Sequence, residues 1–153
     1  MSVPSRIADV PPVPSLADLR ELTLVRFQQN ACNFQLDFAR AILEGKKHVL
    51  LQAGCGMGKT LSFWVPLLAR TSGSLIVVTP LTLLCDQHVE NLSEAGIQAI
   101  FVLINRSRTN ARQDIGSGIY RVVITSPEQL MKEGGGFPQV SATFSPWVMG
   151  HTV

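Results

Sequence analysis

The stretch LLQAGCGMGKT, Leu50–Thr60, decides the fold of this chain. Three glycines alternate with other residues, and a lysine and a threonine follow the last of them. Glycines lack a Cβ atom, so consecutive backbone N–H groups can curl around a phosphate. A helix that begins near Lys59 would add the positive end of its dipole. The stretch therefore predicts a loop that binds a nucleoside triphosphate.

The loop fits the pattern A-x-x-x-x-G-K-T, with alanine where the first glycine is usual. We expect Lys59 to reach the β- and γ-phosphates of ATP and the Thr60 hydroxyl to ligate Mg²⁺. The alternative is a glycine-rich turn without a ligand. The cysteine of the loop is interpreted as an inert small side chain, although oriented amides can make a thiol sensitive to oxidation. The candidate cofactor-binding residues of the loop are Ala53, Gly54, Cys55, Gly56, Met57, Gly58, Lys59 and Thr60.

Strand and helix patterns alternate around the loop. HVLLQA, residues 48–53, is a short apolar run typical of a buried parallel strand, and residues 61–70 read as a helix. Short strands alternating with helices predict an α/β fold, a parallel sheet flanked by helices. Further strands are expected at residues 74–80, 97–104 and 120–127, and further helices at residues 81–96, 111–118 and 128–136.

Two helices are expected before the loop. The first begins near Ser15 or Asp18 and places Leu16, Leu19, Leu22 and Val25 on one face. The second covers residues 34–45 and stops at a glycine. The proline-rich residues 1–15 are predicted to form a disordered leader.

Composition excludes several classes of protein. Of the 153 residues, 46% are hydrophobic and 16% are charged, which indicates a folded globular chain. The net charge of +2 does not favour strong binding of polyanions. Three cysteines without a CxxC pair argue against a structural zinc site and fit a reducing intracellular compartment. Residues 1–15 lack the apolar core of a signal peptide, and no apolar run of the chain is long enough for a membrane helix.

Three blocks of sequence together resemble a RecQ-like superfamily-two DNA helicase of the fungal type. They are residues 34–68, which contain the loop, residues 77–100 (VVTPLTLLCDQHVENLSEAGIQAI) and residues 120–131 (YRVVITSPEQLM). The resemblance implies a partial ATP-binding RecA-like lobe over residues 16–137 and an irregular tail over residues 138–153. It also implies ATP and Mg²⁺ as cofactors, Gln35 as the reader of adenine, and weak contact with single-stranded or duplex DNA. The implied nucleic-acid-binding residues are Pro80, Thr82, Gln87 and Ser126.

The sequence also departs from this family. NACNFQ, residues 30–35, lacks the arginine that usually precedes the adenine-reading glutamine, and Cys55 stands where threonine is usual. The Asp-Glu-x-His box that holds Mg²⁺ is absent, because no Asp or Glu follows Phe137. Glu128 is interpreted as a carboxylate at the start of a helix rather than as a substitute catalytic acid. No catalytic residue is therefore assigned.

The resemblance implies a nuclear, ATP-driven 3′-to-5′ DNA helicase, of which this chain is an incomplete first lobe that is inactive alone. A single lobe cannot clamp ATP against a partner lobe and step along a strand. Two alternatives stay open. One is a non-catalytic module that binds a nucleotide or a nucleic acid, and the other is a different P-loop enzyme such as a small kinase.

Overall fold

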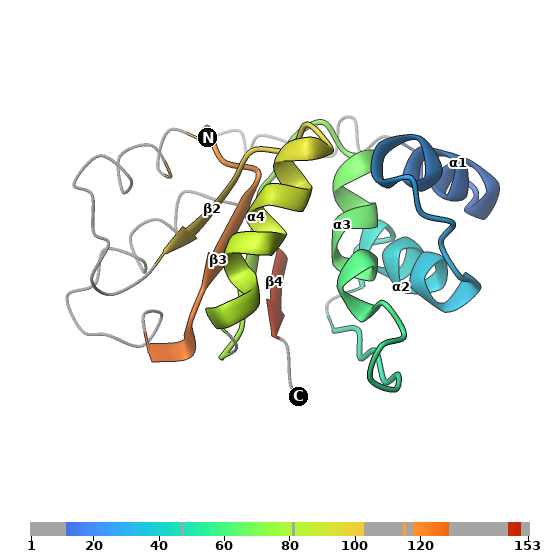
Figure 1. The fold of residues 1–153 in the computed structure, drawn as a ribbon. Coiled ribbons are helices and arrows are strands. Elements are labelled where there is room, and N and C mark those ends of the chain that lie inside the picture. The colour runs from blue at the N-terminus through green and yellow to red at the C-terminus, as the bar shows by residue number, and fades with distance from the viewer. Residues whose placement is uncertain are drawn as a thin grey trace, which may run out of the picture. The chain divides into compact units, whose positions relative to one another are not determined.

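The chain divides into two units, residues 1–70 and residues 71–153. The structure is a computed structural model that describes residues 12–46, 48–80, 82–102, 115, 118–128 and 147–150. The first unit contains helices α1, α2 and α3, and the second contains a sheet with helix α4 (Figure 1). Neither the proline-rich leader before residue 12 nor most of the helices expected at 111–118 and 128–136 belongs to the described residues.

The three helices of the first unit pack against one another. They are α1 (Leu16–Phe27), α2 (Asn33–Leu43) and α3 (Lys59–Ala69). Helix α3 is apolar over most of its surface, and its residues 61–67 are all buried. The rings of Phe38 and Phe63 meet edge to face with centroids 5.8 Å apart, which joins α2 to α3.

A capping box begins α1 at the position that the sequence predicts. The Asp18 amide donates to Ser15 Oγ at 3.2 Å, and the Ser15 amide donates to Asp18 Oδ2 at 3.0 Å. The Ser15 hydroxyl and then its backbone amide lower the pKa of the Asp18 carboxyl. The buried face of α1 differs from the expectation, because Leu19 and Thr23 are buried while Val25 is 70% exposed.

The strand expected at residues 48–53 is absent from the structure, so this prediction was wrong. Residues 48–54 have no regular secondary structure, and the Leu50 side chain is 91% exposed. A strand needs a neighbour that accepts and donates its backbone hydrogen bonds. All the described strands lie in the second unit, so the apolar run has no strand partner within its own unit.

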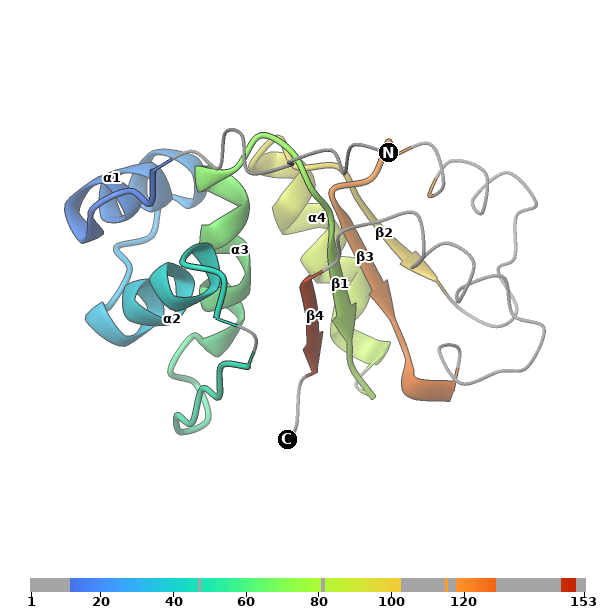
Figure 2. The ribbon, with the colours of Figure 1, turned by 180° about the vertical axis from the view of Figure 1, so that it is seen from behind.

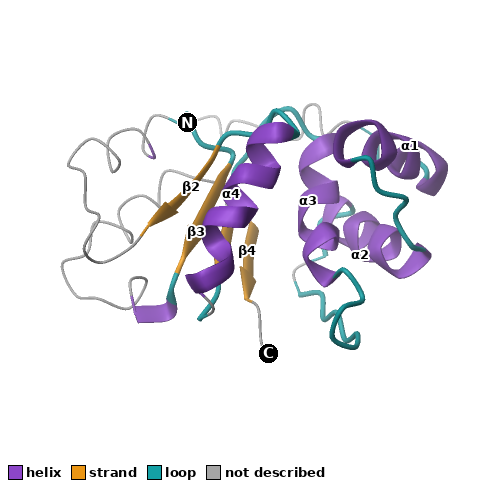
Figure 3. Ribbon diagram, viewed as in Figure 1, coloured by secondary structure: helices purple, strands orange, loops and turns teal. Residues whose placement is uncertain are grey.

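The second unit is a four-stranded parallel sheet with the order β2-β3-β1-β4 (Figure 2). Helix α4 lies across one face of the sheet and follows a short 3₁₀ helix, η1 (Figure 3). This topology confirms the predicted α/β class. The bounds are β1 (Leu75–Val78), η1 (Thr82–Leu84), α4 (Cys85–Glu94), β2 (Ala99–Val102), β3 (Val122–Thr125) and β4 (Trp147–Gly150).

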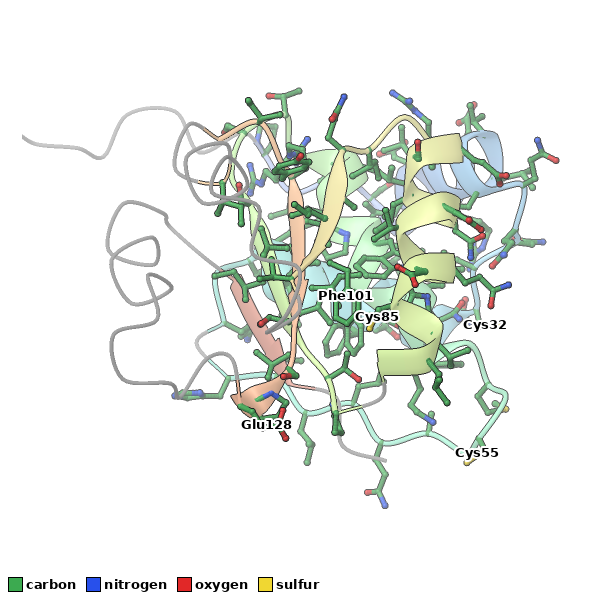
Figure 4. All side chains as sticks on the ribbon, turned by 60° about the vertical axis from the view of Figure 1, so that its left-hand side comes forward. Cys32, Cys55, Cys85, Phe101 and Glu128 are labelled. Carbon is green, nitrogen blue, oxygen red and sulfur yellow. The ribbon has the colours of Figure 1, made fainter. Side chains whose placement is uncertain are left out.

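Apolar side chains cover both faces of this sheet. Ile76, Ile115 and Val123 form a buried cluster on one face. On the other face, α4 contacts β2, and Cys85 and Phe101 lie in the layer between the helix and the sheet (Figure 4). Burial, followed by the nearby charge of Asp86, raises the pKa of the Cys85 thiol.

The last strand corrects the expectation of an irregular tail after residue 137. Residues Trp147–Gly150 form β4, which pairs with β1 in parallel, and Leu75 lies opposite Trp147. The sequence did not predict β4 because neither the strand period nor the helix period persists after residue 137. No helix among the described residues is long and apolar enough to cross a membrane.

Candidate functional site

The glycine-rich loop leads directly into α3, as the sequence predicts. Gly56 and Gly58 have positive φ angles of 75° and 71°, which residues with a Cβ atom rarely adopt. The Met57 amide donates to the Gly54 carbonyl at 3.4 Å, and the Leu61 amide donates to the Gly58 carbonyl at 3.1 Å. These two turns place the first amides of α3 immediately after the exposed loop.

The Lys59 side chain folds back over the loop. Its ammonium donates to the carbonyl oxygens of Ala53 and Gly54, both at 2.9 Å. These contacts hold the positive charge beside the residues that the sequence assigns to phosphate binding. Thr60, the predicted Mg²⁺ ligand, is half-buried as the second residue of α3, and Cys55 is exposed (Figure 4).

The amide of Gln35 links the beginning of α2 to the loop. Its Nε2 donates to the Gly58 carbonyl at 2.8 Å and lies 3.5 Å from the Met57 carbonyl oxygen. Its Oε1 accepts from the Cys32 amide at 2.7 Å, and the residue is only 4% exposed. A Cβ atom on Gly58 would lie 2.8 Å from Gln35 Nε2. Gln35 therefore positions the loop in this structure.

A second polar contact near this helix start was not predicted from the sequence. Arg20 of α1 donates through Nη2 to Asn33 Oδ1 at 2.6 Å and through Nε to the Ala31 carbonyl at 3.3 Å. Arg20 precedes Asn33 by 13 residues, so no local pattern connects them. The packing of α1 on α2 therefore brings Arg20 beside residues 30–35, a stretch that contains no arginine of its own.

The predicted nucleic-acid-binding residues lie at or after the carboxyl ends of two paired strands. Pro80 is exposed after β1, and Ser126 is 6% exposed after β3. The Thr79 amide donates to the Thr125 carbonyl at 2.9 Å, which extends the pairing of the two strands. Thr82 belongs to η1, and Gln87 is exposed on α4. Ligands of open parallel sheets bind at this end of the strands.

Negative charge dominates the described part of this strand end. The Ser126 hydroxyl and then the backbone amide of Glu128 lower the pKa of the Glu128 carboxyl, so it is ionised at neutral pH. Figure 4 shows Glu128 just beyond β3. Arg121 is the single Lys or Arg among the described residues of 71–153, and it precedes β3 at the opposite end. The described residues also contain no group of three His, Cys, Asp or Glu side chains able to hold a metal.

Comparison with known proteins identifies a matching family and a similar curated protein. Residues 32–143 match the family described as DEAD/DEAH box helicase. Among curated proteins, the chain is similar to ATP-dependent DNA helicase RecQ of Bacillus subtilis (strain 168), with 28% identity over 94 residues. This alignment covers 60% of the chain and 16% of the relative. The family match includes the loop at 53–60 and the residues that follow β1 and β3.

Proposed function

This chain belongs to the DEAD/DEAH box helicase family, and we propose that its loop at residues 53–60 binds Mg-ATP. The observation that carries the proposal is the position of the Lys59 ammonium, 2.9 Å from two carbonyl oxygens of a loop that opens an α-helix. A lysine, a helix start and glycines with positive φ are the parts that a triphosphate needs from one polypeptide segment.

Each group of the loop has one task in this proposal. The Lys59 ammonium exchanges the carbonyls of Ala53 and Gly54 for the β- and γ-phosphate oxygens. The amides that begin α3 donate to the same phosphates, and the Thr60 hydroxyl ligates Mg²⁺. Mg²⁺ neutralises charge on the phosphate oxygens. Gln35 holds the loop in shape through the Gly58 carbonyl.

The substitution Lys59→Ala tests this assignment. Titration of a ribose-labelled fluorescent ATP analogue is expected to give an affinity at least about tenfold weaker in the variant, because a charge-assisted hydrogen bond contributes about 1.5–3 kcal/mol. Lys46→Ala is the matched control, because Lys46 is an exposed lysine of the same unit that lies after α2. Equal affinities of Lys59→Ala and the wild type would reject the role of Lys59.

We further propose that a longer protein containing this chain unwinds DNA in the nucleus in the 3′-to-5′ direction. Family membership and the similarity to a RecQ helicase support the helicase class. Strand displacement from duplexes with a 3′ or a 5′ overhang tests the direction. Displacement only from the 5′ overhang would contradict it. The alternative is a nucleotide-binding module without catalysis.

DNA contact by this chain is expected to be weak and tolerant of sequence. Its proposed site is formed by Pro80, Thr82, Gln87 and Ser126, and the nearby Glu128 carboxylate repels phosphates. Fluorescence anisotropy of labelled single strands should show binding that weakens when the salt concentration rises from 50 to about 200 mM. Tight binding that depends strongly on base sequence, or binding that ignores salt, would contradict this expectation.

A further inference from the structure

The strand β2 leaves one row of backbone groups without a strand partner. It lies at the end of the order β2-β3-β1-β4, so among the described strands it pairs with β3 alone (Figure 2). The Val122 amide of β3 donates to the Gln98 carbonyl at 3.1 Å, and Ala99 lies opposite Val122. Because the backbone groups of successive residues point to opposite sides of a strand, those of Ile100 also face β3. The N–H and C=O groups of Ala99 and Phe101 therefore face the open edge.

The sequence of β2 does not protect this edge with charge or proline. The strand Ala99–Val102 reads AIFV, and each of its residues is half-buried. Edge strands are often blunted by a charged side chain or a proline, because their open backbone groups can pair with another chain. The apolar composition continues on both sides of the strand, in IQAIFVLI at residues 97–104. The open edge is therefore suited to pairing with another uncharged strand.

We propose that β2 pairs in antiparallel orientation with β2 of a second copy of this chain, with Ile100 opposite Ile100 of the other copy. The backbone groups of Ile100 face β3, so this central pair is a non-hydrogen-bonded pair. On each side of the centre, Ala99 of one copy lies opposite Phe101 of the other, and such a pair exchanges both of its backbone hydrogen bonds. This register satisfies every outward backbone group of Ala99 and Phe101.

The side chains of β2 fit the same register. Ile100 packs against the buried cluster that contains Val123, and a second Ile100 would extend this cluster across the two-fold axis. Facing β-branched side chains stabilise an antiparallel pair. On the other face of the sheet, the small Ala99 side chain lies opposite the large Phe101 ring, so two bulky groups do not meet (Figure 4). Because both copies use the same edge, the assembly closes as a dimer.

A cysteine at the centre of the pairing tests the register. In a chain that carries Cys32→Ser and Cys55→Ser, the two exposed thiols are removed, and Ile100→Cys places new thiols opposite each other. The Cα atoms of a non-hydrogen-bonded pair are about 4.5 Å apart, which a disulfide can span. We expect mild oxidation to link Ile100→Cys into covalent dimers. The control Ala99→Cys should stay unlinked, because its two Cα atoms would be about 8 Å apart.

Sedimentation equilibrium measures the dimer without a cross-link. The wild type should form dimers as its concentration rises to about 100 µM. Ala99→Pro removes an outward N–H but keeps the pairing of β2 with β3, because an edge strand accepts proline where its nitrogen faces outward. Its dimer dissociation constant should be at least about tenfold higher, since symmetry removes the hydrogen bond twice. Ala99→Ser, which keeps the N–H group, should match the wild type.

Three results would overturn the inference. The first is a wild type that stays monomeric at this concentration, which would leave the edge to a strand of another protein. The second is growth beyond the dimer, which indicates pairing between two different edges of the sheet. The third is cross-linking of Ala99→Cys as readily as of Ile100→Cys, which would show contact without the proposed register.

Discussion

A polypeptide of these 153 residues is expected to release phosphate from ATP only at the background rate. Hydrolysis needs Mg²⁺ held by acidic side chains, an oriented water and an arginine that stabilises the transition state. No Asp or Glu follows Glu133, and the Glu128 carboxylate, which follows β3, is hydrogen-bonded to the Ser126 side chain. The resemblance to RecQ-like helicases places this arginine in a second lobe, and loss of such an arginine alone lowers turnover by about 10³ to 10⁵. Without the acidic pair as well, we expect no measurable turnover.

The assay measures phosphate release with and without single-stranded DNA. Lys59→Ala subtracts contaminating ATPases, because it removes the proposed phosphate contact. Turnover that DNA stimulates and that disappears in Lys59→Ala would show that another acid has taken the catalytic role. Glu128→Gln would then be the next variant, since this carboxylate lies at the carboxyl end of β3.

Gly58→Ala is expected to destabilise the first unit and to abolish nucleotide binding. Gly58 has a φ angle of 71°, and a left-handed conformation costs a residue with a Cβ atom about 1–2 kcal/mol. The added methyl group would also lie 2.8 Å from Gln35 Nε2 and push the amide away from the Gly58 carbonyl. Leaving that buried amide without its hydrogen-bond partner lowers the free energy of unfolding further, by about 1–3 kcal/mol.

Gly45→Ala separates the cost of the left-handed backbone conformation from the cost of losing the contact between Gln35 and Gly58. Gly45 has a similar φ angle of 78°, but an added Cβ atom would meet nothing within 4 Å. Urea unfolding should therefore show a smaller loss of unfolding free energy in Gly45→Ala than in Gly58→Ala, and nucleotide binding should survive in the control. Equal losses in the two variants would show that the contact between Gln35 and Gly58 contributes nothing to the stability of the loop.

Most helices and three strands could be predicted because their signals are local. Ser15 and Asp18 begin α1 through a box four residues long, and the runs at β1, β2 and β3 are short and apolar. The match of residues 32–143 to a helicase family agrees with the resemblance that the sequence motifs carry. These features depend on residues that are neighbours in the chain.

The two errors about strands have a common physical cause. Residues 48–53 have the composition of a strand but do not pair, whereas residues 147–150 pair with β1 without a visible pattern. A strand exists only through hydrogen bonds to another segment, so its own residues cannot decide its presence. The exposed Val25 on α1 is a similar error, because the packing of neighbouring helices selects the buried face.

The sequence by itself determined the phosphate loop, because glycine backbone freedom and a helix start are properties of consecutive residues. Only the tertiary structure decided which partners the side chains of Gln35 and Asn33 contact. The contact from Gln35 to Gly58 joins residues 23 apart, and the contact from Arg20 to Asn33 joins residues 13 apart. Both depend on how α1, α2 and α3 pack, and a hydrogen bond tolerates only a few tenths of an ångström of error in that packing.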